Sequence, residues 1–253
     1  MEKHRRLVEA TVIPYVKVEA IAADNLKPWD SKFQGVPYLS KDTAYPRGRD
    51  GRKMYLIAQI NFADVPDIEP LPEKGLLQFW LNAGDPLDTD DFKVTFHEEV
   101  ETAELSSEKV TTDGSRLPVF EFPDQAYRLT FSQGRMPITS SDYRFEEQYK
   151  GTPDFFEDLY EEYLDRNDNF GNGASLNEFA HRIGGYPSFV QFDPRAIDAA
   201  DAQTDKDFLL LQIDTDPDNG IMWGDTGVGH FFISSEKLGK KDFSDILFSW
   251  DAS

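Results

Sequence analysis

A repeated order of short strings constrains the fold of this chain more than any other feature of its sequence. Three strings occur early in the chain, and three similar strings follow later in the same order and at similar spacing. The pairs are Gly35-Val36-Pro37-Tyr38 with Gly184-Gly185-Tyr186-Pro187, Leu56-Ile57-Ala58-Gln59-Ile60-Asn61 with Leu209-Leu210-Leu211-Gln212-Ile213-Asp214, and 75–81 with 229–233. A unit of strand, long connection and strand therefore occurs twice, which predicts an internal duplication whose copies bury a shared face. Chance similarity between short apolar strings remains the alternative.

Alternating and continuous apolar runs predict that most of the regular structure is strand. Besides the repeated strings, the expected strands are 12–22, 92–97, 117–122 and 127–132. The strand that contains the repeated string at 56–61 is expected to span 54–62. Two helices are also expected, one that opens at Pro153 with its apolar face over 155–164, and one from Ser175 to just before Gly184. Aromatic residues make up 13% of the chain, which favours twisted sheets over a helical bundle.

We expect one compact domain over residues 1–253. Its two structural repeats would cover approximately 12–135 and 175–253, joined by a helical segment at 141–174. A chain of this length buries enough surface to fold without disulfides or a structural metal. The absence of cysteine excludes disulfides, thiolate metal sites and a cysteine nucleophile.

The formal net charge of −21 disfavours nucleic acid and anionic lipid as partners, because both would be repelled. Such acidity serves solubility, or it serves binding to a basic protein partner. The first residues lack the apolar stretch of a signal peptide, and no run of eighteen apolar residues occurs in the chain. We therefore expect a cytoplasmic protein with no membrane contact, and the oligomeric state stays open.

The repeated strings also carry a family resemblance. The matching segments are 31–38, 56–62, 75–80, 181–187, 209–214 and 222–229. In these segments the chain resembles the YwqG-like family of bacterial proteins of unknown function. The resemblance implies an α+β, mainly β fold of roll-like sheets, with an internally duplicated β-rich unit and a few peripheral helices. It implies no established activity and no catalytic residues.

The stretch 214–220 is the most suggestive of a metal site. Carboxylates at alternate positions of a tight loop converge on Ca²⁺ in known calcium loops, with an acid twelfth in the loop. The candidate ligands are Asp214, Asp216, Asp218 and Asp225. The sixth position is Asn219 instead of glycine, however, and Asn219-Gly220 is a strong hairpin turn. A plain turn is the preferred interpretation, calcium is the alternative, and no other cofactor is expected.

The chain contains no serine-hydrolase elbow, phosphate-binding loop or dinucleotide fingerprint. Polar residues that interrupt the repeated apolar strings either satisfy buried backbone groups or face a cleft between the two copies. The candidate cleft residues are Gln59, Asn61, Trp80, Gln212, Asp214, Trp223, Asp225 and His230.

Two classes of function follow from these observations. The preferred one is a non-enzymatic binding or protein-interaction module, of which an immunity-type protein is one form, whose acidic surface engages a basic partner. The alternative is an enzyme of unrecognised class that uses carboxylates and His181 or His230 in the cleft between the repeats.

Overall fold

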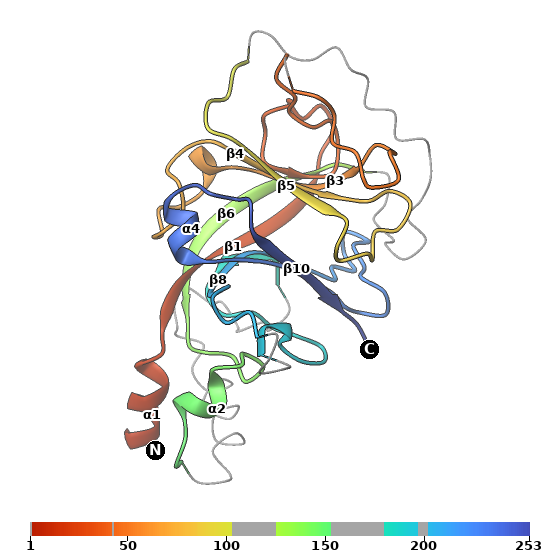
Figure 1. The fold of residues 1–253 in the computed structure, drawn as a ribbon. Helices are drawn as coiled ribbons and strands as arrows, with labels where there is room; N and C mark the ends of the chain where they lie inside the picture. The colour runs from red at the N-terminus through yellow and green to blue at the C-terminus, as the bar shows by residue number, and fades with distance from the viewer. Residues whose placement is uncertain (1, 42, 103–124, 153–179, 197–201) are drawn as a thin grey trace.

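The computed structural model describes residues 2–41, 43–102, 125–152, 180–196 and 202–253. In these residues one antiparallel sheet of ten strands has the order β10-β9-β8-β7-β1-β6-β2-β3-β4-β5 (Figure 1). The strands are β1 (Ile13–Ala22), β2 (Lys32–Phe33), β3 (Tyr55–Asn61), β4 (Leu76–Leu81), β5 (Phe92–His97), β6 (Tyr127–Met136), β7 (Arg182–Gly184), β8 (Phe208–Asp214), β9 (Val228–Ile233) and β10 (Ile246–Asp251). The expectation of a mainly β fold is thereby confirmed.

Short helices lie around this sheet. They are α1 (Glu2–Glu9), α2 (Phe145–Gln148) and α4 (Ser235–Gly239), with the 3-10 turns η1 (Phe62–Asp64) and η2 (Pro194–Ala196). The helix expected at 155–164 and the strand expected at 117–122 lie outside the described residues. None of the helices in the described part of the chain is long and apolar enough to cross a membrane.

The two longest strands form the centre of the sheet. β1 and β6 pair along their whole length, from Ile13 opposite Met136 to Ala22 opposite Tyr127. The other edge of β1 pairs with β7, and the other edge of β6 pairs with β2. The sheet therefore has two flanks, which we call the N-terminal flank (β2 to β5) and the C-terminal flank (β7 to β10).

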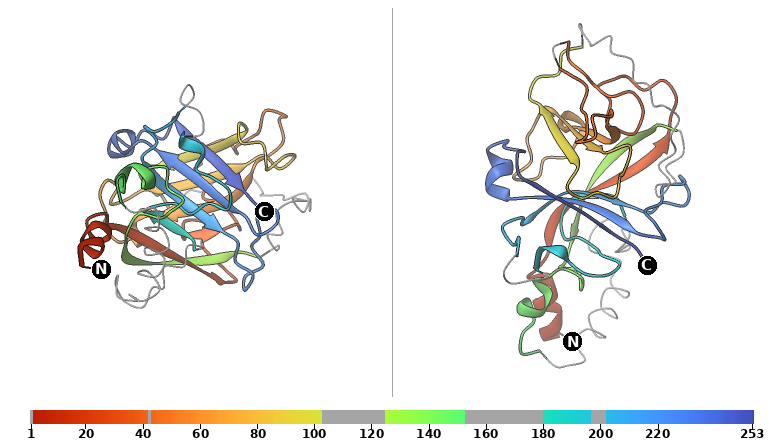
Figure 2. Two further views of the ribbon diagram at one scale, coloured as in Figure 1. Left: turned by 90° about the horizontal axis from the view of Figure 1, so that it is seen from below. Right: turned by 45° about the vertical axis from the view of Figure 1, so that its right-hand side comes forward.

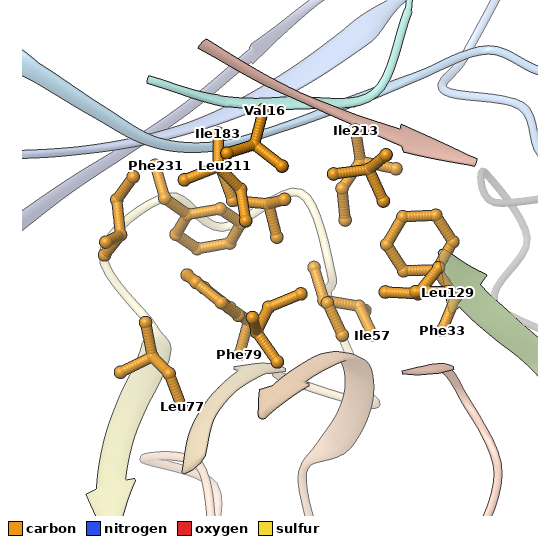
Figure 3. Packing of buried hydrophobic residues seen from close by; sticks show 14 of the residues in the cluster. Val16, Phe33, Ile57, Leu77, Phe79, Leu129, Ile183, Leu211, Ile213 and Phe231 are labelled. Carbon is orange, nitrogen blue, oxygen red and sulfur yellow. The ribbon is translucent and has the colours of Figure 1, made fainter. Parts of the chain in front are cut away.

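One face of the sheet carries the main hydrophobic core. Side chains from both flanks point toward one another in Figure 3, with Phe231 and Leu211 on one side and Phe79 and Ile57 on the other. The rings of Phe79 and Phe231 lie 4.8 Å apart between centroids, although the two residues stand on opposite flanks. The rings of Phe92 on β5 and Phe248 on β10, the two edge strands, lie 5.5 Å apart between centroids. The sheet is therefore curled so that its yellow and dark blue ends approach each other (Figure 2).

The expected helix that starts at Ser175 is wrong at its C-terminal end. Residues 182–184 form β7, because Ile183 pairs with Val16 of β1 and Arg182 pairs with Gln212 of β8. Pairing on both edges outweighs the local helical pattern, since sheet partners come from distant parts of the chain.

Candidate functional site

A row of polar residues crosses the outer face of the C-terminal flank. Arg182 on β7 pairs with Gln212 on β8, Gln212 pairs with His230 on β9, and His230 pairs with Ser249 on β10. Side chains at successive positions of a strand point to opposite faces. This row therefore lies on the face opposite the core that contains Phe231.

The middle of the row holds the backbone of Ser188 against the sheet. The amide oxygen of Gln212 accepts a hydrogen bond from the Ser188 N–H at 3.0 Å. Nε2 of His230 donates to the Ser188 carbonyl oxygen at 2.8 Å. Both backbone groups of one residue are thus satisfied by buried side chains, which fixes where the segment after β7 passes over the strands.

Asp251, at the end of β10, provides a second attachment for the same segment. Its Oδ2 accepts hydrogen bonds from the backbone N–H groups of Val190 at 2.9 Å and Gln191 at 2.8 Å. Residues 188–191 are therefore held at two points, at Ser188 and at Val190 with Gln191. Together with the residues up to 194 they form an arch over the ends of β9 and β10.

A pocket of about 390 Å³ lies under this arch. Its apolar wall includes Phe189, Phe192 and Pro194, and its polar lining includes His230, Ser249 and Asp251. Phe192 is 56% exposed at the pocket. Pockets of this size with an apolar wall and a few polar groups are typical of small-ligand sites.

Three polar atoms of the pocket residues are buried and make no hydrogen bond within the described part of the protein. They are Nδ1 of His230, Oγ of Ser249 and Oδ1 of Asp251. Such atoms are uncommon in folded proteins, and each leaves a desolvation cost unrelieved. All three belong to residues that line the pocket.

Burial shifts the pKa values of two of these groups. Burial lowers the pKa of His230 to about 3, and the ring is therefore neutral at physiological pH. Since Nε2 carries the proton that is donated to Ser188, Nδ1 is a hydrogen-bond acceptor. Burial also raises the pKa of Asp251, while the backbone N–H groups that it binds lower the pKa.

The N-terminal flank carries a similar row whose atoms bond to one another. The amide oxygen of Gln59 accepts from the Tyr38 N–H at 2.9 Å, and Nε2 of Gln78 donates to the Tyr38 carbonyl at 2.8 Å. Thr95 Oγ1 and His97 Nε2 both contact Oε1 of Gln78 at 3.0 Å. On this flank the side chains of the row bond to one another and to the backbone of Tyr38.

The structure separates the residues of the predicted cleft into two groups. Gln59, Asn61 and Trp80 lie on the N-terminal flank, and the others lie on or beside the C-terminal flank. The wholly buried members are Gln59, Trp80, Gln212, Trp223 and His230, while Asp214 is 2% exposed and Asp225 is exposed. Of this set, His230 lines the pocket described above, which lies within one flank and not between the two.

The predicted calcium ligands sit on a tight turn and its surroundings. Asp216 and Ile221 exchange two backbone hydrogen bonds, of 2.7 and 2.9 Å, which close the turn between them. Asp218 and Asp225 are exposed, and Asp214 is buried on β8. Within the described ranges no three His, Asp or Glu side chains are grouped to hold a metal ion. The calcium site stays a prediction.

Most pocket residues were not predicted from the sequence. Ser249 and Asp251 belong to β10, in which Leu247, Ser249 and Asp251 alternate with apolar Phe248 and Trp250. That period of two is a strand signal and could have identified the element. The arch over the strands has no comparable signal, because its position depends on hydrogen bonds to residues about forty to sixty positions away in the chain.

No curated protein matches this chain in sequence. Residues 31–252, which include both flanks of the sheet and the pocket, match the model of a family described as a domain of unknown function, DUF1963. The chain therefore belongs to the DUF1963 family.

Proposed function

We propose that the protein is a binding module for a small molecule, and that the ligand occupies the pocket between β9, β10 and residues 189–194. One observation carries the proposal. Three buried polar atoms, on His230, Ser249 and Asp251, lack hydrogen-bond partners at a pocket with an aromatic wall. A ligand that fills the pocket would satisfy them and cover the exposed ring of Phe192.

Binding is better supported than catalysis by these side chains. A serine nucleophile requires a base hydrogen-bonded to it and a third group that orients the base. Among the described residues, His230 is instead bonded to the Ser188 carbonyl, and Asp251 is bonded to backbone N–H groups. The histidine and the aspartate thus already serve structural roles. The described residues of this site therefore form no hydrogen-bonded series of serine, histidine and aspartate that would support the alternative of an enzyme.

Two further expectations, one on a protein partner and one on the location of the protein, stay proposals. A basic protein partner, including an immunity-type role, is supported by the net charge of −21. A cytoplasmic location likewise stays a proposal. Neither is needed for ligand binding in the pocket.

We also propose that the fold is internally duplicated, as the YwqG-like resemblance implies. The lengths of strands β1 to β5 follow the same pattern as those of β6 to β10. The pairing of β3 with β4 shifts register between Leu56 and Ala58, and the pairing of β8 with β9 shifts register at the corresponding place, between Leu209 and Leu211. The repeats would then divide between β5 and β6, and not after residue 135. Superposition of β1 to β5 on β6 to β10 in an experimental structure tests this, and different connectivity would contradict it.

The binding proposal is tested with a fragment library and a matched pair of variants. Phe192 and Ile21 are both exposed apolar residues, at 56% and 54%, but only Phe192 of these two lines the pocket. Fragments found by ligand-observed NMR on the wild type should lose affinity for Phe192→Ala and keep it for Ile21→Ala. Equal affinity for both variants, or no fragment bound by the wild type, would overturn the proposal.

A further inference from the structure

We infer that the ligand of this pocket is a small organic cation, with an N–H-donating amine or amidine group beside an apolar, preferably aromatic, body. The inference rests on the proposed binding function and names the chemical class of the ligand. It follows from the hydrogen-bonding capacity of the pocket, from the charge of Asp251 and from the aromatic wall.

The unpartnered atoms of the pocket are mainly acceptors. Nδ1 of His230 accepts, because Nε2 holds the proton of the neutral ring, and Oδ1 of Asp251 accepts as a carboxylate oxygen. Ser249 Oγ can donate or accept. A ligand that satisfies all three must therefore carry several N–H or O–H donors, and a group with acceptors alone would leave the histidine and the aspartate unsatisfied.

The carboxylate of Asp251 has no cationic partner among the ion pairs of the described residues. Arg195 is bonded to Asp193 at 2.6 Å and to Asp142 at 3.0 Å. Arg182 stands three strands away from β10, about 14 Å across the sheet. A half-buried carboxylate without a counter-ion is costly, and a charged N–H donor relieves that cost with a hydrogen bond stronger than a neutral one.

The wall of the pocket suits a cation with an apolar body. Phe189 and Phe192 line it, and the faces of aromatic rings attract cations in addition to burying apolar surface. Carboxylate and aromatic side chains together are complementary to such a ligand and not to an anion. The net charge of −21 acts in the same direction by raising the local concentration of cations.

Three probes with the same ring and different charge test this inference. They are benzamidine, which is cationic, benzamide, which is neutral, and benzoate, which is anionic. Isothermal titration calorimetry on the wild-type protein should give tightest binding for benzamidine, at least about tenfold tighter than for benzamide, which is the size of one charge-assisted hydrogen bond. Benzoate should be the weakest.

A matched pair of variants assigns the preference to Asp251. Asp251→Asn removes the charge and keeps an oxygen acceptor for the backbone of Val190 and Gln191. Asp67→Asn removes the same charge from an exposed site in the β3–β4 connection. Benzamidine should lose about tenfold in affinity for Asp251→Asn and be unchanged for Asp67→Asn.

The outcomes separate this inference from the proposed function. Benzamide or benzoate binding as tightly as benzamidine to the wild type would overturn the cationic class and leave the binding function standing. The same conclusion follows if library fragments bind in the pocket and benzamidine does not. If no compound of either set binds, both proposals fail. The comparison of the three probes on the wild type decides the charge preference even if Asp251→Asn does not fold.

Discussion

Gln212 and His230 face each other across β8 and β9 and hold the two backbone groups of a single residue, Ser188. This pair fixes the arch over the pocket. Both side chains are wholly buried, and removing either leaves a buried backbone group without a partner.

Replacing Gln212 should therefore destabilise the fold. In Gln212→Leu the backbone N–H of Ser188 and the carbonyl of Ala180 lose their partner, and we expect the free energy of unfolding in urea to fall by about 2–4 kcal/mol. Gln133 on β6 is exposed, and Gln133→Leu should change the same quantity by less than about 0.5 kcal/mol. Equal stability of the two variants would show that the arch is not held by Gln212.

Gly229 has no room for a side chain. A Cβ at this position would lie 2.3 Å from a ring carbon of Trp223, which is itself completely buried. Gly229→Ala should lower the free energy of unfolding by about 1–3 kcal/mol, because Trp223 must move within a packed core.

Gly239, at the end of α4, provides the control for this substitution. A Cβ there meets nothing within 4 Å, and Gly239→Ala should be neutral or slightly stabilising. A Gly229→Ala protein with the melting temperature of Gly239→Ala would contradict the packing described for Trp223.

Asp214 should make stability depend on pH. Burial raises the pKa of Asp214 to about 7, and the backbone N–H of Thr215 and the charge of Arg182 oppose this only in part. Since the unfolded carboxyl titrates near about 4, the unfolded state releases the proton first as pH rises. The folded state therefore binds more protons between about pH 4 and 7, and stability falls across this window.

Asp214→Asn removes that dependence. We expect the variant and the wild type to be similar near about pH 4 and the variant to be more stable above about pH 7, by up to about 4 kcal/mol. Urea unfolding at a series of pH values measures this difference, with Asp67→Asn as the exposed control. A difference between variant and wild type that does not change with pH would contradict the account.

Lys32 should act in the opposite direction at higher pH. It is completely buried on β2, where its ammonium group donates to the carbonyl oxygens of Lys27 at 2.8 Å and Pro28 at 2.9 Å. Burial lowers the pKa of Lys32 to about 7, while Asp30 raises the pKa. Between about pH 7 and 10 the folded state has lost a proton that the unfolded state keeps, so stability rises with pH.

Comparison with Lys32→Met isolates this contribution. Relative to the variant, the free energy of unfolding of the wild type should rise by about 1 kcal/mol per pH unit between about pH 7 and 9. Lys93 on β5 is exposed, and Lys93→Met should leave the slope unchanged. Equal slopes for wild type and Lys32→Met would mean that Lys32 is not buried as described.

Much of the fold could be predicted from the sequence because long strands carry their own pattern. The strand at 92–97 was predicted with its observed bounds, and β1, β3, β4 and β8 were predicted to within a few residues. β2 and β7, of two and three residues, could not be, because neighbouring strands create them and no periodicity develops over so short a length. Tertiary pairing, and not local preference, defines these two elements.

The candidate site was predictable only in part, for a related reason. The sequence marked His230 as an expected neighbour of the polar residues that interrupt the repeated strands. Its role at a pocket depends on Phe189 and Phe192, which reach it because Ser188 and Val190 bond to residues far along the chain. A sequence pattern indicates which face of a strand is apolar, but it does not indicate which loop covers a given face.

A crystal structure of the protein with bound benzamidine tests the central claim most directly. The account predicts electron density for the ring in the pocket against Phe192, with an amidinium nitrogen within hydrogen-bond distance of Oδ1 of Asp251. Density for the probe only at other surfaces, with ordered water as the only partner of His230, Ser249 and Asp251, would contradict it.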